Sequence, residues 1–182
     1  LTLSNPEIQV DIELEEDLWM VFADEVQISQ VLNNLFINAK QAMDNSGLIK
    51  VKASNFLYKK KKQLPINLGK YVEIIIEDTG PGIPQDVINN IFDPFFTTKD
   101  SGTGLGLASS YSIMKKHGGY IMVKSELGKG AIFNLYLPGL EEKQVYVEPK
   151  LSNEAELSVL KLNKYEEVNA VFNKQFSTNK HK

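Results

Sequence analysis

The chain shows two hydrophobic patterns: short segments of strand character and longer segments with apolar residues at helical spacing. Strict alternation puts every second side chain on one face and therefore predicts a strand with one buried face. The third such segment is apolar enough to be a central strand. The five predicted strands are IQVDIEL (Ile8 to Leu14), IKVKASNF (Ile49 to Phe56), YVEIIIED (Tyr71 to Asp78), YIMVKS (Tyr120 to Ser125) and AIFNLYLP (Ala131 to Pro138).

Helical spacing predicts two long helices, Asp24 to about Met43 and Leu105 to His117. Asp24 followed three residues later by Gln27 is a start signal of the capping-box kind, and a Gly-Gly pair ends the second helix. Pro84 suits the first turn of a short third helix through about Asn90. The buried stripe predicted for the first helix is Ile28, Val31, Leu32, Leu35, Ala39 and Ala42.

The order of these elements is strand, helix, two strands, helices around a loop, and two strands. This order predicts an α+β fold, a two-layer sandwich with helices on one face of a mixed, mainly antiparallel sheet. The 182 residues suffice for one domain, expected over residues 1–140, with an appendage. Residues 141–182 read as a linker-like tail in which Asn153 and Glu156 could cap a helix over about 153–176.

Composition narrows the range of functions. The formal net charge of −3 argues against nucleic-acid binding by bulk charge. The absence of cysteine excludes disulfide frameworks, zinc knuckles and thiol nucleophiles. No apolar run reaches the ~18–20 residues of a membrane span, and no signal peptide is visible. The chain starts at Leu1 rather than Met, which suggests a fragment of a longer protein.

Four consecutive lysines, Lys59 to Lys62, indicate a solvated hairpin tip, with a docking patch as the alternative.

Asn34 and Asn38 lie four residues apart and therefore share one face of the first predicted helix. Gln27, Gln30 and Gln41 lie near the same polar stripe. Amide oxygens are neutral, hard ligands of the kind that Mg²⁺ accepts. By itself, an asparagine pair more often marks a merely solvated helix face.

The segment EDTGPGIP, Glu77 to Pro84, places a carboxylate at the end of an apolar strand. Asp78 can accept a hydrogen bond from an amino group there, and Gly80 and Gly82 let the chain turn and let a flat ring approach the backbone. The alternative is a plain strand-ending turn.

Three glycines occupy five residues, Gly102 to Gly106, directly before the second long helix. Glycines expose backbone N–H groups, and the helix adds its unpaired amides and positive end, so the segment suits a phosphate. Thr97, Thr98 and Lys99 could add hydroxyl donors and a cation. No Gly-Lys-Ser/Thr follows, and a loop rather than a strand precedes, so neither the P-loop nor the Rossmann pattern applies. The alternative is a flexible loop with incidental glycines.

In order, the motifs Asn-x-x-x-Asn, Asp-x-Gly-x-Gly, Phe-x-x-Phe-Phe-Thr-Thr-Lys, Gly-x-Gly-x-Gly and Gly-x-Gly-x-x-Phe resemble the boxes of the bacterial sensor histidine kinase catalytic domain. The resemblance covers about Ile8 to Pro138. It implies the Bergerat ATP-binding fold of the superfamily shared with DNA gyrase, a heat-shock chaperone and a mismatch-repair protein. The sequence from Phe92 to Gly119 looks most like that of the nitrogen-regulator type and related hybrid kinases.

The resemblance also implies roles for single residues. Asn38 would coordinate Mg²⁺ with Asn34 beside it, and Asp78 would bind the adenine amino group. Phe92 to Ser101 would form a mobile lid, with Phe95 and Phe96 as anchors and Lys99 reaching for phosphate; Asn34 and Lys99 would be the catalytic pair. The implied ATP-binding set is Asn34, Asn38, Gln41, Asp78, Gly80, Gly82, Ile83, Phe95, Phe96, Thr97, Thr98, Lys99, Gly102, Thr103, Gly104, Leu105, Gly106 and Leu107.

Two departures from related families bear on the reaction. Gyrase-like relatives carry a glutamate at position 34 that activates water, whereas an amide is no useful general base. Position 131 is often threonine in the family but is Ala131 here, so one polar contact is missing.

The phosphoacceptor is expected outside the chain. His117 is expected to be a helix-end cation, so the acceptor histidine would lie on a separate dimerisation hairpin, and a receiver domain is the other expected partner. The resemblance implies a cytoplasmic setting, even if the parent is membrane-anchored, and no contact of this fragment with nucleic acid or membrane. Alternatives are a nucleotide-binding module without transfer activity, a gyrase- or chaperone-like ATPase and an anti-sigma type serine kinase.

Overall fold

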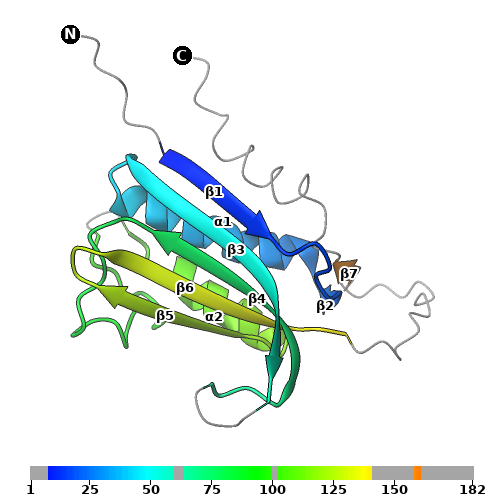
Figure 1. Cartoon of the computed structure of the whole chain (residues 1–182). Helices are drawn as coiled ribbons and strands as arrows, with labels where there is room; N and C mark the ends of the chain where they lie inside the picture. The colour runs from blue at the N-terminus through cyan, green and yellow to red at the C-terminus, as the bar shows by residue number, and fades with distance from the viewer. Residues whose placement is uncertain (1–7, 60–63, 100–101, 141–157, 161–182) are drawn as a thin grey trace.

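The computed structural model describes residues 8–59, 64–99, 102–140 and 158–160. Within these residues the chain forms seven strands and two helices (Figure 1). The elements in chain order are β1 (Ile8–Leu14), β2 (Val21–Ala23), α1 (Glu25–Ala42), β3 (Gly47–Tyr58), β4 (Gly69–Asp78), α2 (Gly106–Lys116), β5 (Tyr120–Glu126), β6 (Gly130–Pro138) and β7 (Ser158–Leu160).

Five strands form one sheet in the order β1-β3-β4-β6-β5, and both helices lie behind it on the same face (Figure 1). β1 pairs with β3 in parallel, and the other three pairs are antiparallel. The prediction of a two-layer sandwich with a mixed, mainly antiparallel sheet is confirmed. All five strands predicted from the hydrophobic pattern are present.

The core lies between the helices and the inner face of the sheet. Phe36, Leu35 and Leu135 are among the largest fully buried side chains, and burying such a residue contributes about 1.5–3 kcal/mol. The predicted stripe of α1 needs one correction. Ala42 is exposed, whereas Phe36, one turn after Leu32, is buried. The buried residues of α1 are Ile28, Val31, Leu32, Leu35, Phe36 and Ala39.

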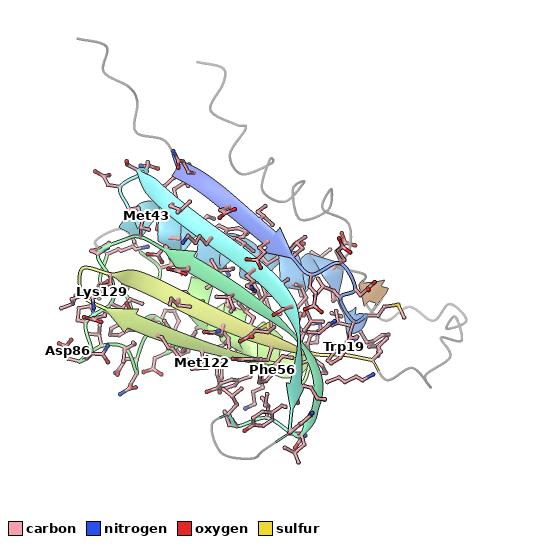
Figure 2. The ribbon with its side chains drawn as sticks, in the orientation of Figure 1. Trp19, Met43, Phe56, Asp86, Met122 and Lys129 are labelled. Carbon is pink, nitrogen blue, oxygen red and sulfur yellow. The ribbon has the colours of Figure 1, made fainter. Side chains whose placement is uncertain are left out.

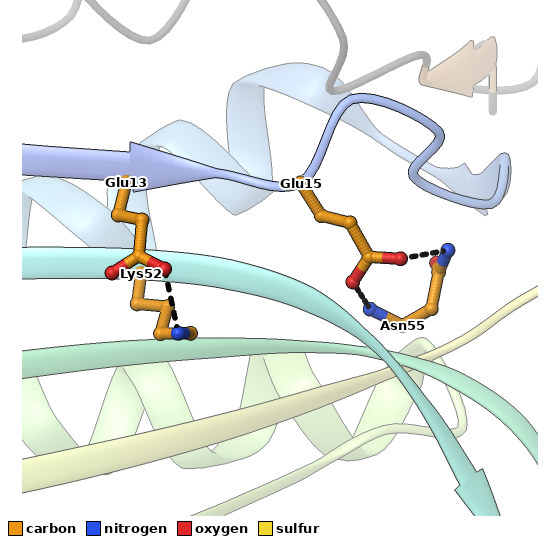
Figure 3. Close-up of polar contacts among 4 residues, drawn as sticks. All are labelled: Glu13, Glu15, Lys52 and Asn55. Carbon is orange, nitrogen blue, oxygen red and sulfur yellow. Dashed lines mark hydrogen bonds and ion pairs between the residues drawn. The ribbon is translucent and has the colours of Figure 1, made fainter.

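Side-chain contacts fix the parallel edge of the sheet (Figure 3). Lys52 Nζ on β3 donates to Glu13 Oε1 on β1 at 2.7 Å, and this bond raises the pKa of Lys52. Beyond the end of β1, the Glu15 carboxylate accepts from the backbone N–H of Asn55 at 3.0 Å and from its side-chain amide at 3.1 Å. Asn55 Oδ1 in turn accepts from the backbone N–H of Trp19 at 2.8 Å. These bonds hold the chain where it leaves β1 toward β2.

The outer face of the sheet carries a second, aromatic cluster. Tyr58, Tyr71 and Tyr136 are buried there, with Phe56 and Met122 packed against them (Figure 2). The Tyr136 hydroxyl is buried beside Glu73, so burial and that carboxylate raise its pKa far above the ordinary value. This cluster stabilises the end of the β3–β4 hairpin, on the side away from the helices.

The short helix predicted for Pro84 to Asn90 is wrong. The segment forms successive turns with i to i+3 bonds, from the N–H of Val87 to Pro84 O and from the N–H of Asn90 to Val87 O. The start of the segment is instead hydrogen-bonded to the β5–β6 hairpin. The N–H of Ile83 donates to Ser125 Oγ, and the Gln85 side chain donates to Ser125 O, both at 2.7 Å. These tertiary bonds replace a helix that would have had only two turns.

Two short strands were not predicted. β2 is three residues long, too short for a hydrophobic period to reveal it, and it pairs antiparallel with β7. β7 lies inside the segment 153–176 for which a helix was expected, so the helix prediction is wrong for Ser158–Leu160. The remainder of that segment lies outside the described residues.

Candidate nucleotide site

A cavity of about 590 Å³ lies between α1, the end of β4, the turns after β4 and the start of α2. Most of the predicted ATP-binding set lines it, although the residues come from separate segments between Asn34 and Leu107. Three predicted residues do not line it: Gly80, Phe95 and Leu105. The predicted residues that do line it are Asn34, Asn38, Gln41, Asp78, Gly82, Ile83, Phe96, Thr97, Thr98, Lys99, Gly102, Thr103, Gly104, Gly106 and Leu107.

Asp78 is the buried acid of the cavity, with 6% of its surface exposed. Its Oδ1 accepts the backbone N–H of Gly80 at 2.9 Å and that of Ala131 at 3.3 Å. Burial raises the pKa of Asp78, and the two backbone hydrogen bonds lower it in part. Within the described part of the chain, Oδ2 accepts no hydrogen bond. A carboxylate oxygen in this state fits a donor such as an amino group.

Gly130, the second glycine of the Gly-x-Gly-x-x-Phe motif, positions this carboxylate. It has φ +89°, and a Cβ at this position would overlap the Asp78 carbonyl. Only glycine lets the start of β6 come close enough for the N–H of Ala131 to reach Asp78. The signal was present in the Gly-x-Gly-x-x-Phe motif, but spacing alone did not distinguish it from an ordinary turn.

The walls near Asp78 are apolar and were missed by sequence reasoning. Ile37, Val87, Ile91 and Phe133 line the cavity together with small residues of α1 and β6. Ile91 and Phe133 also belong to the core. In a sequence, a side chain that faces an apolar cavity has the same pattern as one that faces the core. This end of the cavity therefore suits a flat, largely apolar ring with one amino group.

Lys99 contacts two side-chain amides of α1 that also line the cavity. Its Nζ donates to Asn38 Oδ1 at 3.2 Å and to Gln41 Oε1 at 2.7 Å, and partial burial lowers its pKa. The two amide oxygens that bind the Lys99 ammonium are also suitable ligands for a divalent metal ion. Among the described residues, no group of three or more His, Cys, Asp or Glu could hold a metal. A cation here would therefore take its protein ligands from amide oxygens.

The start of α2 also opens onto the cavity, since Gly106 and Leu107 line it. The N-cap position is Leu105, no side chain caps the helix, and no acidic residue lies in its first turn. The first N–H groups of a helix have no partner within it and carry partial positive charge, so this end suits an anion. In the preceding loop the N–H of Gly102 is already committed, since it donates to Lys99 O at 3.1 Å. The predicted role of Gly102 as a free donor is therefore not met in this structure.

Phe95 and Gly104 form a tight backbone contact that corrects the predicted lid anchors. The N–H of Phe95 donates to Gly104 O at 3.0 Å, and both residues have positive φ, 67° and 66°. A Cβ on Gly104 would overlap the Phe95 backbone. This conformation turns the Phe95 ring outward, where it is 74% exposed, so Phe95 is no anchor. Phe96 packs against the core instead.

His117, for which the sequence suggested a helix-end cation, lies directly after α2, and both of its ring nitrogens have partners. Its Nε2 accepts the backbone N–H of Asp24 at 3.1 Å, and its Nδ1 lies 2.8 Å from Ile113 O. The histidine joins the end of α2 to the start of α1 and lies outside the cavity lining.

Comparison with known proteins identifies the family. Residues 23–141 match the family described as Histidine kinase-, DNA gyrase B-, and HSP90-like ATPase. The chain belongs to this family. It is 42% identical over 158 residues to the sensor kinase CckA of Brucella abortus (strain 2308), which covers 84% of this chain and 17% of that protein. It is also 42% identical over 132 residues to the sensor histidine kinase ZraS of Escherichia coli (strain K12), covering 72% and 26%. The chain thus spans about a quarter or less of these relatives.

Solved structures agree with this assignment. The catalytic domain of the histidine kinase ThkA, in a nucleotide-free form, is 33% identical with a TM-score of 0.58, covering 72% of this chain and 79% of that one. Full-length ShkA in complex with AMPPNP is 31% identical with a TM-score of 0.59, covering 72% and 26%. The fold is that of histidine kinase catalytic domains, a family that binds ATP, generally with Mg²⁺. The nitrogen-regulator or hybrid subtype stays a prediction.

Proposed function

We propose that this chain is the catalytic domain of a sensor histidine kinase, which binds ATP with Mg²⁺ and transfers the γ-phosphate to a histidine on another domain. One observation carries the proposal. A single cavity joins a buried carboxylate with an open acceptor, Asp78, to the uncapped start of α2. The cavity combines a buried acid and apolar side chains, which suit a base, with amide oxygens, a lysine and a helix start, which suit phosphates and a metal.

In this proposal, different residues bind the base, the phosphates and the metal. Asp78 accepts from the adenine amino group, and the apolar walls around it exclude water. The free amides of α2 and Lys99 hold the phosphates, and Asn38 with Gln41 offers oxygens to the metal. When bound, Mg²⁺ supplies positive charge that offsets the charge of the phosphates. Catalysis in this proposal is positioning and charge neutralisation, because Asp78, the one carboxylate among the described residues that line the cavity, is engaged with the base.

The phosphoacceptor in this proposal lies on a separate dimerisation hairpin of the parent protein. Within the described part of the chain the one histidine, His117, has both ring nitrogens engaged and does not line the cavity. His181 lies outside the described residues. A response-regulator receiver domain is the proposed second partner. None of the helices described here is long and apolar enough to cross a bilayer; we place the domain in the cytoplasm, where ATP is available.

Replacement of Asp78 tests the base-binding half of the site. Asp78→Asn keeps an oxygen for the N–H groups of Gly80 and Ala131, so the fold should be retained. Its amide N–H would then face a donor on the ligand, and we expect about 10- to 100-fold weaker binding of an ATP analogue by calorimetry. Glu77→Gln, one residue earlier on the outer face of β4, is the matched control and should change little. Unchanged affinity of Asp78→Asn would refute the assignment of the base.

A reconstitution experiment tests transfer. The chain is mixed with its own dimerisation hairpin and labelled ATP, and label is expected on the hairpin histidine. Nucleotide binding without any label on the hairpin would favour a module that binds nucleotide without transfer. Appreciable ATP hydrolysis by the isolated chain would favour the gyrase-like reading.

A further inference from the structure

The side-chain amide of Asn34 is bonded to the start of α2. Its Nδ2 donates to Gly106 O at 3.0 Å and to Ser110 Oγ at 3.2 Å. The Ser110 hydroxyl donates in turn to Gly106 O at 2.9 Å. Ser110 is fully buried, so these three groups form a closed polar cluster between the two helices. No motif in the sequence pointed to Ser110.

This cluster fixes which end of the Asn34 amide faces the cavity. An amide nitrogen has two protons, and both have an acceptor on α2. Rotating the amide by 180° would place Asn34 Oδ1 against Gly106 O, two acceptors at hydrogen-bond distance with no proton between them. Asn34 lines the cavity, and within the described part of the chain its Oδ1 accepts no hydrogen bond. The group left for a ligand is therefore an oxygen and never an N–H.

We propose that Ser110 is a positioning residue that, together with the Gly106 carbonyl, holds Asn34 Oδ1 toward the cavity as a fixed neutral acceptor for the metal or its bound water. This inference rests on the proposed function and deepens it. An outward oxygen attracts a cation and its hydration shell, whereas an outward N–H would attract phosphate oxygen. Ser110 and the Gly106 carbonyl together thereby determine which of these two ligands residue 34 serves.

The same cluster specifies an amide at position 34. A carboxylate in its place has no proton to give to Gly106 O and would meet that carbonyl with a second oxygen. The α2 side of the cluster thus disfavours the acid that would serve as a general base. An amide oxygen can hold a water but cannot take its proton, so the arrangement suits transfer to an acceptor rather than hydrolysis.

Ser110→Ala tests the proposal, with Ser112→Ala on the exposed face of the same helix as the matched control. Alanine suits a helix, so the fold should be retained. The affinity for a non-hydrolysable ATP analogue is measured with Mg²⁺ and in EDTA. We expect Ser110→Ala to weaken binding of the analogue about fivefold when Mg²⁺ is present, which corresponds to the loss of one hydrogen bond. In EDTA we expect the affinity to fall less than about twofold. In an Asn34→Ala background the same change should have less than about a twofold effect, since the two residues act as one unit.

A readout without nucleotide separates this inference from the proposed function. In the nucleotide-free protein, Ser110→Ala should shift the side-chain ¹⁵N–¹H₂ signals of Asn34, and Ser112→Ala should not. Equal losses with and without Mg²⁺, an undiminished effect in the Asn34→Ala background, or unmoved Asn34 signals would overturn the positioning role. Failure of the unaltered chain to bind the analogue would instead contradict the proposed function, and the Asn34 signals would still report whether Ser110 holds the amide.

Discussion

The two helices of this domain begin in opposite ways. α1 starts with Asp24, whose Oδ1 accepts the N–H of Gln27 at 3.1 Å, and an acid, Glu25, follows in the first turn. α2 starts with Leu105, which offers no capping bond, and no acid lies in its first turn. α1 thus has a capping side chain of its own for the N–H of Gln27. α2 leaves its first amides at the edge of a cavity that also holds Lys99.

The difference shows what the uncapped start is for. Every helix start has the same unpaired N–H groups, and a capping side chain contributes about 1 kcal/mol. A protein that caps one helix and not the other has forgone that contribution at the second. Since the cavity lies there, the simplest physical reason is that an anionic ligand provides the cap. A variant in which α2 has a cap like that of α1 therefore tests this explanation.

The largest effect is expected from Leu105→Asp. Leu105 is 45% exposed, so the substitution needs little repacking. A carboxylate at this position is attracted to the free amides and should stabilise the helix by about 0.3–1 kcal/mol. It should also repel phosphate and compete for the same N–H groups, and we expect affinity for an ATP analogue to fall about 100-fold or more by calorimetry.

Two further variants separate charge from capping. Leu105→Asn offers a neutral capping oxygen and should weaken binding less than the acid does. Leu105→Ala removes the apolar side chain alone and should change affinity little, because Leu105 does not line the cavity. If Leu105→Asp were to bind the analogue as tightly as the unaltered chain, α2 would not be the phosphate-binding helix.

Lys99→Met is expected to have the next largest effect. It keeps the side-chain length but removes the ammonium that now contacts Asn38 and Gln41. We expect the ATP analogue to bind about fivefold to tenfold more weakly. This is the loss in affinity expected when one charge-assisted hydrogen bond to phosphate is removed at a partly exposed site. Lys115→Met, exposed near the far end of α2, is the control and should bind normally. An equal loss in both variants would indicate a general charge effect rather than a contact of Lys99.

The candidate site could be predicted largely from sequence because its polar groups carry motifs. Residue type and spacing together predicted the chemistry of Asn38, Asp78 and the glycines before α2. The apolar walls, such as Ile91 and Phe133, were not predicted, because facing a cavity and facing the core give the same pattern. Ser110 was missed for a related reason: one serine within a helix gives no sign that its hydroxyl is buried.

The fold was predicted where local pattern and tertiary packing agree, as in the five strands and the two long helices. It was not predicted where tertiary bonds decide the local shape. Pro84 starts turns because Ile83 and Gln85 bond to Ser125 across the chain. Phe95 points outward because its backbone pairs with Gly104. β2 and β7 each have three residues, so their pairing with one another defines them rather than any periodicity.

The smallest effect is expected at the other helix. Asp24→Ala removes the cap of α1, and we expect the free energy of unfolding at neutral pH to fall by about 1 kcal/mol in urea titrations. Affinity for the ATP analogue should stay within about twofold of the unaltered chain, because Asp24 does not line the cavity.

The pH dependence of this loss follows from the charge of the Asp24 cap. The hydrogen bond from the N–H of Gln27 is the largest cause that lowers the pKa of Asp24 in the folded chain. The unfolded chain, with the ordinary value of about 3.9, therefore binds the proton more readily, and the stability that Asp24 adds is present above that pH. As pH falls through the lowered value, this contribution disappears, and the two proteins should converge in stability once the pH lies below that value. A difference that persisted unchanged at that pH would mean that Asp24 acts through packing rather than through its charge.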